Sequence, residues 1–227
     1  MSRKNTILKC FTFLFFLVFA IEVIAESFSY KPLILIFKPL IPLTLILMYI
    51  EESEKKNVVY IVLMFLSLVT NLLFIPNTFE SLFYALVVFT IHRILVIFLI
   101  IRLNQIKDYI PVLIATAPFL IVFFYLYFET PELPESSLII LVLQNILISV
   151  FAGISLSDYV MNDNKQNSIL LISAMLFVML QFSIFIEKYY LNNEYSCILR
   201  PLSMSLNAMA FFTFYKYVLE AEKSNKN

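Results

Sequence analysis

The chain has 227 residues, of which 61% are hydrophobic and 14% are charged, with a mean hydropathy of +0.90 and a formal net charge of zero. Because soluble domains average about 45–50% apolar residues, this composition argues against a soluble globular fold. The balanced charge excludes a nucleic-acid-binding surface, the single glycine excludes a glycine-rich phosphate loop, and no Cys/His grouping indicates a metal or a cofactor.

Eight apolar stretches follow one another along the chain with short polar connections between them. Each is continuously apolar for about 20 residues, whereas the strands of a membrane barrel alternate apolar and polar residues over about 10 positions. The sequence therefore predicts an all-α integral membrane bundle of eight transmembrane helices that forms a single domain over residues 1–227. The predicted spans are 7–25, 33–50, 57–75, 80–102, 109–128, 137–155, 168–187 and 198–219.

The first stretch has features of both a membrane helix and a secretory signal peptide. It begins with basic residues and ends at Val23, Ile24 and Ala25, which is a signal-peptidase-like sequence. The apolar run is long, however, and Glu22 precedes the cleavage sequence. We expect an uncleaved helix, and cleavage after Ala25 is the alternative.

Basic residues in the connections predict the orientation of the bundle, because cytoplasmic loops are enriched in Lys and Arg. The connection around Glu129 is acidic, which fits the outer face. Both termini are therefore predicted to lie inside. The predicted inner set is Arg3, Lys4, Lys9, Lys55, Lys56, Arg102, Lys107, Lys165, Lys216, Lys223 and Lys226, against an outer set of Lys31, Lys188 and Arg200.

Polar side chains inside the predicted spans gather at one depth. Counting about 1.5 Å per residue from the outer end of each helix places seven of them about 5–14 Å below the outer surface. Such a layer favours a cavity that is open to the outer leaflet, although polar groups also join helices to one another in membranes. The seven residues are Glu22, Lys38, Asn71, Gln144, Asn145, Gln181 and Asn207.

Lys38 is the most informative of these residues. A lysine this close to the end of a helix can extend its amine to the interface, or it can line a site. Pro39 and Pro42 follow it, and prolines free backbone carbonyls and can bend a helix toward a cavity.

His92 is the one histidine and lies near the middle of the membrane, about 18 Å deep. It is a candidate acid or base, and a hydrogen-bonded structural histidine is the alternative. Glu22 is a second catalytic candidate, and solvation near the interface is its alternative. The candidate substrate-binding residues are Lys38, Asn71, Gln144, Gln181 and Asn207, each of which can instead join helices.

Four segments resemble those of the YhhN family of eight-helix membrane proteins. Residues 37–43 (Phe-Lys-Pro-Leu-Ile-Pro-Leu) resemble the Lys-Pro-Leu signature of its second helix, and residues 67–73 resemble its Ser-Leu-x-Gly-Asp-x-Leu stretch. Residues 89–92 are similar to a segment of its fourth helix that carries a histidine. Residues 173–181 are similar to its Gly-Ala-x-x-Phe-x-x-Ser-Asp stretch, and Asn207 falls where the family often carries Gln.

The resemblance implies a lysoplasmalogenase, which cleaves the vinyl ether of a lysophospholipid to an aldehyde and a glycerophospho-base. The chain departs from the family pattern at both aspartates, because Asn71 and Gln181 stand in their places. Amides position a substrate but cannot donate the proton that this reaction needs. His92 and Glu22 are the residues that could supply the acid instead, although nothing in the sequence requires it.

Three hypotheses follow from these observations. The first is a divergent lysoplasmalogenase-like protein of a bacterial inner membrane, with a membrane lipid such as a lysophospholipid as its partner. The second is a catalytically inactive lipid-binding or regulatory protein of the same fold. The third is a small-solute transporter, which the lack of a polar stripe through the inner half and of an internal repeat disfavours.

Overall fold

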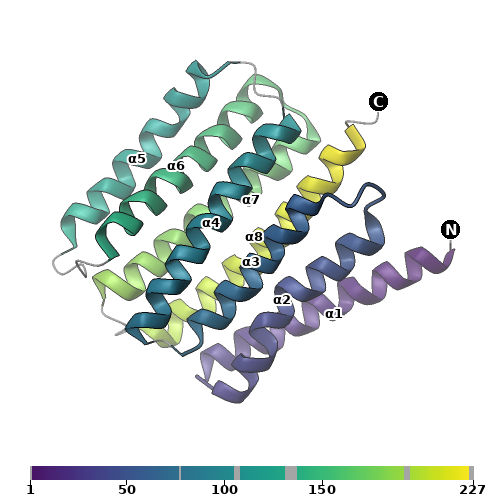
Figure 1. Ribbon diagram of the computed structural model, residues 1–227, viewed down its shortest axis with the longest axis horizontal. Helices are drawn as coiled ribbons and strands as arrows, with labels where there is room; N and C mark the ends of the chain where they lie inside the picture. The colour runs from purple at the N-terminus through teal and green to yellow at the C-terminus, as the bar shows by residue number, and fades with distance from the viewer. Residues whose placement is uncertain (1, 77, 105–107, 131–136, 192–194, 225–227) are drawn as a thin grey trace.

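The computed structural model describes residues 2–76, 78–104, 108–130, 137–191 and 195–224, and within these ranges it is all-helical. This confirms the predicted all-α bundle of eight helices. Figure 1 shows the helices side by side, with the N- and C-termini toward the same end. The helices are α1 (Ser2–Ser27), α2 (Lys31–Glu52), α3 (Val58–Phe74), α4 (Phe79–Asn104), α5 (Ile110–Glu129), α6 (Leu138–Met161), α7 (Lys165–Phe185), continued by the π-helical turn η2 (Ile186–Tyr190), and α8 (Ser196–Ser224).

Seven of these helices are long and apolar enough to cross a membrane by themselves, which makes the chain an integral membrane protein. The eighth, α3, has 17 residues and a length of about 25 Å, and it lies between α2 and α4. Several helices extend beyond the apolar windows predicted for them; α8, for example, continues to Ser224. The backbone keeps its helical hydrogen bonds through the polar turns at the membrane edge, where hydropathy alone no longer marks the helix.

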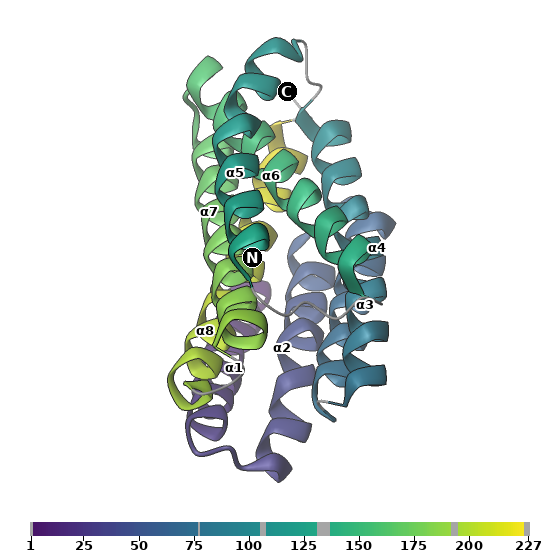
Figure 2. The same cartoon turned by 90° about the vertical axis from the view of Figure 1, so that its left-hand side faces the viewer.

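Helix α2 lies between two pairs of packed helices, and α4 also packs on α6. Helices α3 and α4 pack together, as do α7 and α8, and α2 contacts both α3 and α8. Figure 2 places α3 and α4 on one side of α2 and α8 on the other. Helix α1 packs on α2 and α8, and it continues through Ala25, the end of the signal-peptidase-like sequence, which is buried.

Pro39 and Pro42 lie within α2 without breaking it, since the helix is continuous from Lys31 to Glu52. A proline has no backbone N–H, so Pro42 leaves the carbonyl of Lys38, four residues earlier, without its helical partner. The side chain of Asn71 on α3 supplies that partner, because its Nδ2 donates to the Lys38 carbonyl oxygen at 3.1 Å. As expected, a proline frees a backbone carbonyl in α2. The hydrogen bond from Asn71 to this carbonyl joins α2 to α3.

A buried polar network closes the end of the bundle that carries the termini. The Tyr49 hydroxyl donates to the carboxylate of Glu222 and accepts from the backbone N–H of Asn57 at 2.7 Å. Ser53 donates to the other oxygen of Glu222 at 2.7 Å. The ring of Tyr60 packs against that of Tyr49 at a tilt of 46°, with 4.2 Å between ring centroids. This end therefore joins α2, α3 and α8 by hydrogen bonds.

Replacing Tyr49 with Phe is expected to lower the free energy of unfolding by about 1–3 kcal/mol, because the Asn57 N–H and the Glu222 carboxylate each lose a buried partner. The matched control is Tyr60→Phe. Its hydroxyl is buried without a partner among the described residues, so its removal is expected to leave stability unchanged or to raise it. The measurement is the unfolding midpoint in mixed detergent–SDS micelles, followed by circular dichroism. Equal losses of stability in Tyr49→Phe and Tyr60→Phe would contradict the hydrogen bonds assigned to the Tyr49 hydroxyl.

Candidate functional site: a charged cavity at one end of the bundle

A cavity of about 240 Å³ opens at the end of the bundle opposite to the termini. Helices α2, α3, α7 and α8 contribute residues three, four or seven positions apart, which lie on one face of a helix. The mouth carries Ser29, Lys31 and Pro76, which are exposed. The residues deeper in the cavity are Lys38 and Ile34 from α2, Ser67, Thr70, Asn71 and Phe74 from α3, Phe89 from α4, Leu180 and Ile184 from α7, Glu187 and Lys188 from η2, and Arg200, Ser203, Met204, Asn207 and Phe211 from α8, with Glu26 from α1.

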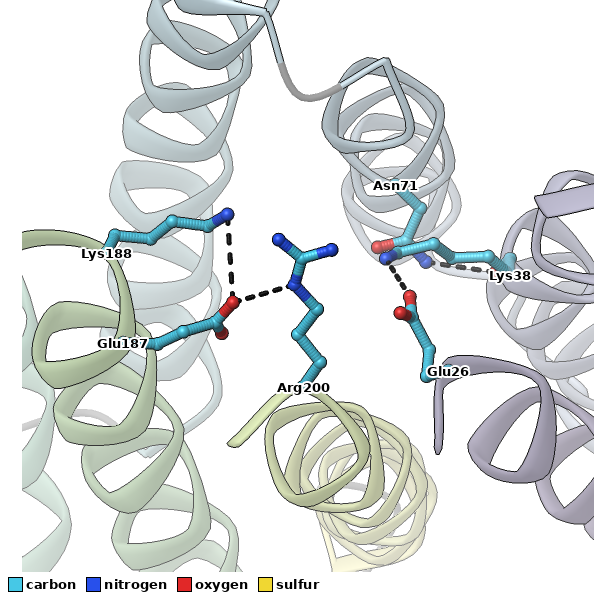
Figure 3. A network of polar contacts seen from close by, with 6 residues as sticks. All are labelled: Glu26, Lys38, Asn71, Glu187, Lys188 and Arg200. Carbon is cyan, nitrogen blue, oxygen red and sulfur yellow. Dashed lines mark hydrogen bonds and ion pairs between the residues drawn. The ribbon is translucent and has the colours of Figure 1, made fainter. Parts of the chain in front are cut away.

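One wall of the cavity carries a buried ion pair between α1 and α2. The Nζ of Lys38 donates to Oε1 of Glu26 at 2.7 Å, and the two side chains are only 8% and 5% exposed. Asn71 lies beside this pair (Figure 3). Its amide nitrogen is engaged by the Lys38 carbonyl, while its Oδ1 has no hydrogen bond to a described residue. Lys38 therefore lines the cavity in an ion pair instead of extending to the interface.

The facing wall carries a second charged group where α7 ends and α8 begins. The Nε of Arg200 donates to Oε1 of Glu187 at 2.8 Å, and the Lys188 amine lies 3.7 Å from the same oxygen. Glu187 is 2% exposed. The Arg200 side chain rises between the two walls, and its guanidinium tip points into the space that separates them (Figure 3).

Besides the charged groups, the described lining is mainly apolar, with the amides of Asn71 and Asn207 and the hydroxyls of Ser67, Thr70 and Ser203. The rings of Phe89 and Phe211 and the side chain of Leu180 are buried there. Asn207 is 6% exposed and makes no hydrogen bond to a described residue. The cavity thus combines charged and apolar side chains, which suits an amphipathic ligand.

Gln144 and Gln181 lie in a different network from the cavity. Both contact Arg93, whose Nη2 donates to Oε1 of Gln181 at 2.8 Å and whose Nη1 donates to the Gln144 carbonyl at 3.3 Å. The Gln144 amide donates to Oγ1 of Thr90 at 2.8 Å, and the Arg93 guanidinium lies 4.5 Å from the centroid of the Phe89 ring. This network joins α4, α6 and α7. The predicted layer is therefore divided, with Lys38, Asn71 and Asn207 on the cavity.

His92 and Glu22, the two residues considered as acids from the sequence, lie behind the cavity lining. The imidazole packs between Phe89 and Phe211, with ring centroids 5.6 and 5.4 Å away, so these two rings separate it from the cavity. Neither ring nitrogen has a hydrogen-bond partner among the described residues. Glu22 is fully buried one helical turn before Glu26, and its carboxyl oxygens likewise have no hydrogen-bond partner there.

The charged residues that sequence reasoning missed are Glu26, Glu187, Lys188 and Arg200. The cations among them had been assigned to the outer connections, and the carboxylates had not been considered. One signal was available: Glu26 follows Glu22 by four residues and therefore lies on the same face of α1. No local signal indicates that the start of α8 comes close to α2 and α3.

A family model described as the YhhN family matches residues 33–215. The chain belongs to the YhhN family. The match includes most of α2, all of α3 to α7 and most of α8, and thus every lining residue of the cavity except Glu26, Ser29 and Lys31. Searches of curated proteins and of solved structures found no match. The YhhN pattern described above carries aspartate at two positions. In this chain Asn71 stands at the first and lines the cavity, and Gln181 stands at the second and accepts a hydrogen bond from Arg93.

Proposed function

We propose that this YhhN protein binds a single-chain ether lipid in the cavity and hydrolyses its vinyl ether bond, as a lysoplasmalogenase does. The observation that carries the proposal is the cavity itself, because its lining combines the charged side chains of Glu26, Lys38 and Arg200 with aromatic and aliphatic side chains. A lysolipid likewise combines a charged headgroup with an apolar chain. Its membrane would be the inner membrane of a bacterium, with the cavity toward the outer leaflet.

The reaction needs a proton donor and a water molecule. Protonation of the outer alkenyl carbon gives an oxocarbenium ion at the carbon that bears the ether oxygen. Water adds to that carbon, and the hemiacetal then collapses to an aldehyde and a free glycerol hydroxyl, returning the proton. The catalytic acid must therefore be a titratable group that reaches the cavity.

Glu26 is the acid that we propose. It lies beside Asn71, the cavity position where the family carries aspartate, and its carboxylate is held by Lys38. When the substrate phosphate takes over the Lys38 amine, the Glu26 carboxyl loses its counter-ion. Glu26 would act as the acid in its protonated form, because only a carboxyl group that carries a proton can donate it to the alkenyl carbon.

The test is release of aldehyde from a lysoplasmalogen by the purified protein and by the Glu26→Gln variant. We expect release by the wild type and a loss of at least about 100-fold in the variant, which is the typical contribution of a general acid. His92→Gln is the comparison variant, and we expect it to keep most of the activity because two rings separate His92 from the cavity. Activity that survives Glu26→Gln but not His92→Gln would contradict this assignment.

A second candidate function is lipid binding without catalysis, and the amide at position 71 favours it. Asn71 donates to the Lys38 carbonyl, and an aspartic acid there can make the same bond only while it carries its proton. If the native chain is inactive, Asn71→Asp is expected to create aldehyde release, because it adds a protonated carboxyl to the cavity. Gln181→Asp is the control, since the new carboxylate would pair with Arg93 outside the cavity. If neither variant releases aldehyde, the chain is not an enzyme that lost its activity through the amide at position 71.

A further inference from the structure

We propose that a second, smaller cavity beside Arg93 binds one monatomic anion, such as chloride. The inference does not depend on the proposed hydrolysis, and the described linings of the two cavities share only Phe89. The smaller cavity measures about 10 Å³, which is room for about one water-sized particle and excludes a phosphate or carboxylate group. Its described lining comes from α4, α6 and α7 and consists of Phe89, His92, Arg93, Val96, Ile148, Phe151 and Phe177.

Arg93 is a buried cation whose contacts are all uncharged. It is 5% exposed and lies within α4, a membrane-spanning helix. Its guanidinium donates to Oε1 of Gln181 at 2.8 Å and to the Gln144 carbonyl at 3.3 Å, and it lies 4.5 Å from the centroid of the Phe89 ring. No carboxylate of the described chain forms an ion pair with it. A charge at membrane depth is costly unless it is paired, so this guanidinium lacks a counter-ion.

His92 supplies a second hydrogen-bond donor to the same cavity. The side chain is 1% exposed, and neither ring nitrogen has a hydrogen-bond partner among the described residues. Because a neutral imidazole carries one N–H, a buried donor is left unused beside the Arg93 guanidinium. A buried water molecule typically makes about three hydrogen bonds, but this lining offers only two polar side chains. A halide ion can accept from both and also offsets the charge of Arg93, which a water molecule cannot do.

Gln181 occupies the place where a carboxylate of the chain itself could neutralise Arg93. Its Oε1 is an uncharged acceptor 2.8 Å from Nη2 of the guanidinium, so it satisfies one N–H without balancing the charge. A carboxylate at this position would form a buried ion pair with the guanidinium and would make a separate anion unnecessary. The anion site is therefore expected with glutamine at position 181 and is expected to be lost with aspartate.

The test is the thermal unfolding midpoint of the full-length protein in dodecyl maltoside, with chloride or bromide replacing gluconate. Gluconate is too large for the cavity, and a constant ionic strength keeps the screening of surface charges equal. A ligand that binds only the folded protein stabilises it by mass action. Above the dissociation constant, each tenfold increase in halide is therefore expected to raise the midpoint by about 3–6 °C. A midpoint that does not change when halide replaces gluconate would overturn the proposal.

Three variants connect the halide response to this cavity. Gln181→Asp is expected to remove the response, and a full response in that variant would overturn the site. His92→Phe keeps a ring but removes the N–H, so it is expected to weaken halide binding at least about tenfold. Lys165→Gln removes an exposed cation outside the cavity and is expected to keep the response.

Bromide locates the anion directly. In crystals of the full-length protein grown with bromide, we expect an anomalous diffraction peak beside the Arg93 guanidinium. Bromide peaks only elsewhere, with a water molecule in this cavity, would overturn the proposal. Neither readout depends on aldehyde release, so this inference and the proposed hydrolysis can fail independently of each other.

Discussion

Replacing Lys38 with Met is expected to destabilise the protein by about 3–5 kcal/mol, the cost of breaking a buried ion pair by removing one partner. Glu26 would keep a carboxylate that is 5% exposed and would lose the cation that lies 2.7 Å away. The loss should appear as a lower midpoint of SDS-induced unfolding in dodecyl maltoside micelles, measured by circular dichroism.

Two further variants make this expectation specific. Lys38→Met combined with Glu26→Gln removes both charges and should recover most of the lost stability, since no charge of the pair then remains buried. Lys165→Met breaks an ion pair at a similar distance, 2.9 Å, but the lysine side chain is 72% exposed. That variant should cost less than about 1 kcal/mol. Equal effects of Lys38→Met and Lys165→Met on the unfolding midpoint would contradict the burial of the Glu26–Lys38 pair.

The Gly153→Ala substitution is expected to have the second large effect, because it forces α5 and α6 apart. A Cβ at position 153 would lie 1.9 Å from Oγ1 of Thr116 and 2.8 Å from its Cα, so the backbone itself obstructs the added methyl group. Overpacking of this kind costs about 1–3 kcal/mol, and here the conflict with backbone atoms places the expected loss at the upper end. Close approach of two helices at a small residue is common in membrane proteins.

The controls for Gly153→Ala come from the same helix pair. Ser149 lies one turn earlier on α6, and its hydroxyl bonds to the carbonyl of Asn145 in its own helix at 2.7 Å. Ser149→Ala should therefore change the unfolding midpoint little. Adding Thr116→Ala to Gly153→Ala should recover only part of the stability, because it removes Oγ1 but leaves the Cα. Full recovery would show that α5 adapts more easily than its backbone position indicates.

The fold was predictable because lipid leaves the backbone few alternatives. A continuously apolar run of about 20 residues must satisfy its amides within the segment, so the number and order of the helices follow from hydropathy. The depth of a residue in the bundle follows in the same way from its place in a helix. Depth grouped Lys38, Asn71 and Asn207 with four other polar residues, and the structure places these three on the cavity.

The direction in which a side chain faces was not predictable from depth. Gln181 and Gln144 lie at depths similar to those of the cavity residues, but the Gln181 side chain accepts from Arg93 and the Gln144 side chain donates to Thr90, both on α4. Glu187 and Arg200 were missed for the same reason. Their pairing depends on how the end of α7 and the start of α8 meet, and contacts between helices are set by packing across the whole bundle.

The most direct test of the central claim, that the cavity holds a single-chain lipid, is native mass spectrometry of the purified protein. The comparison is the wild type with Ser67→Phe, a variant that places a ring in the cavity from a position that is 3% exposed. We expect one lysolipid bound per chain in the wild type and none in a folded Ser67→Phe variant. Bound diacyl lipids alone, or equal lysolipid occupancy in both proteins, would contradict the claim.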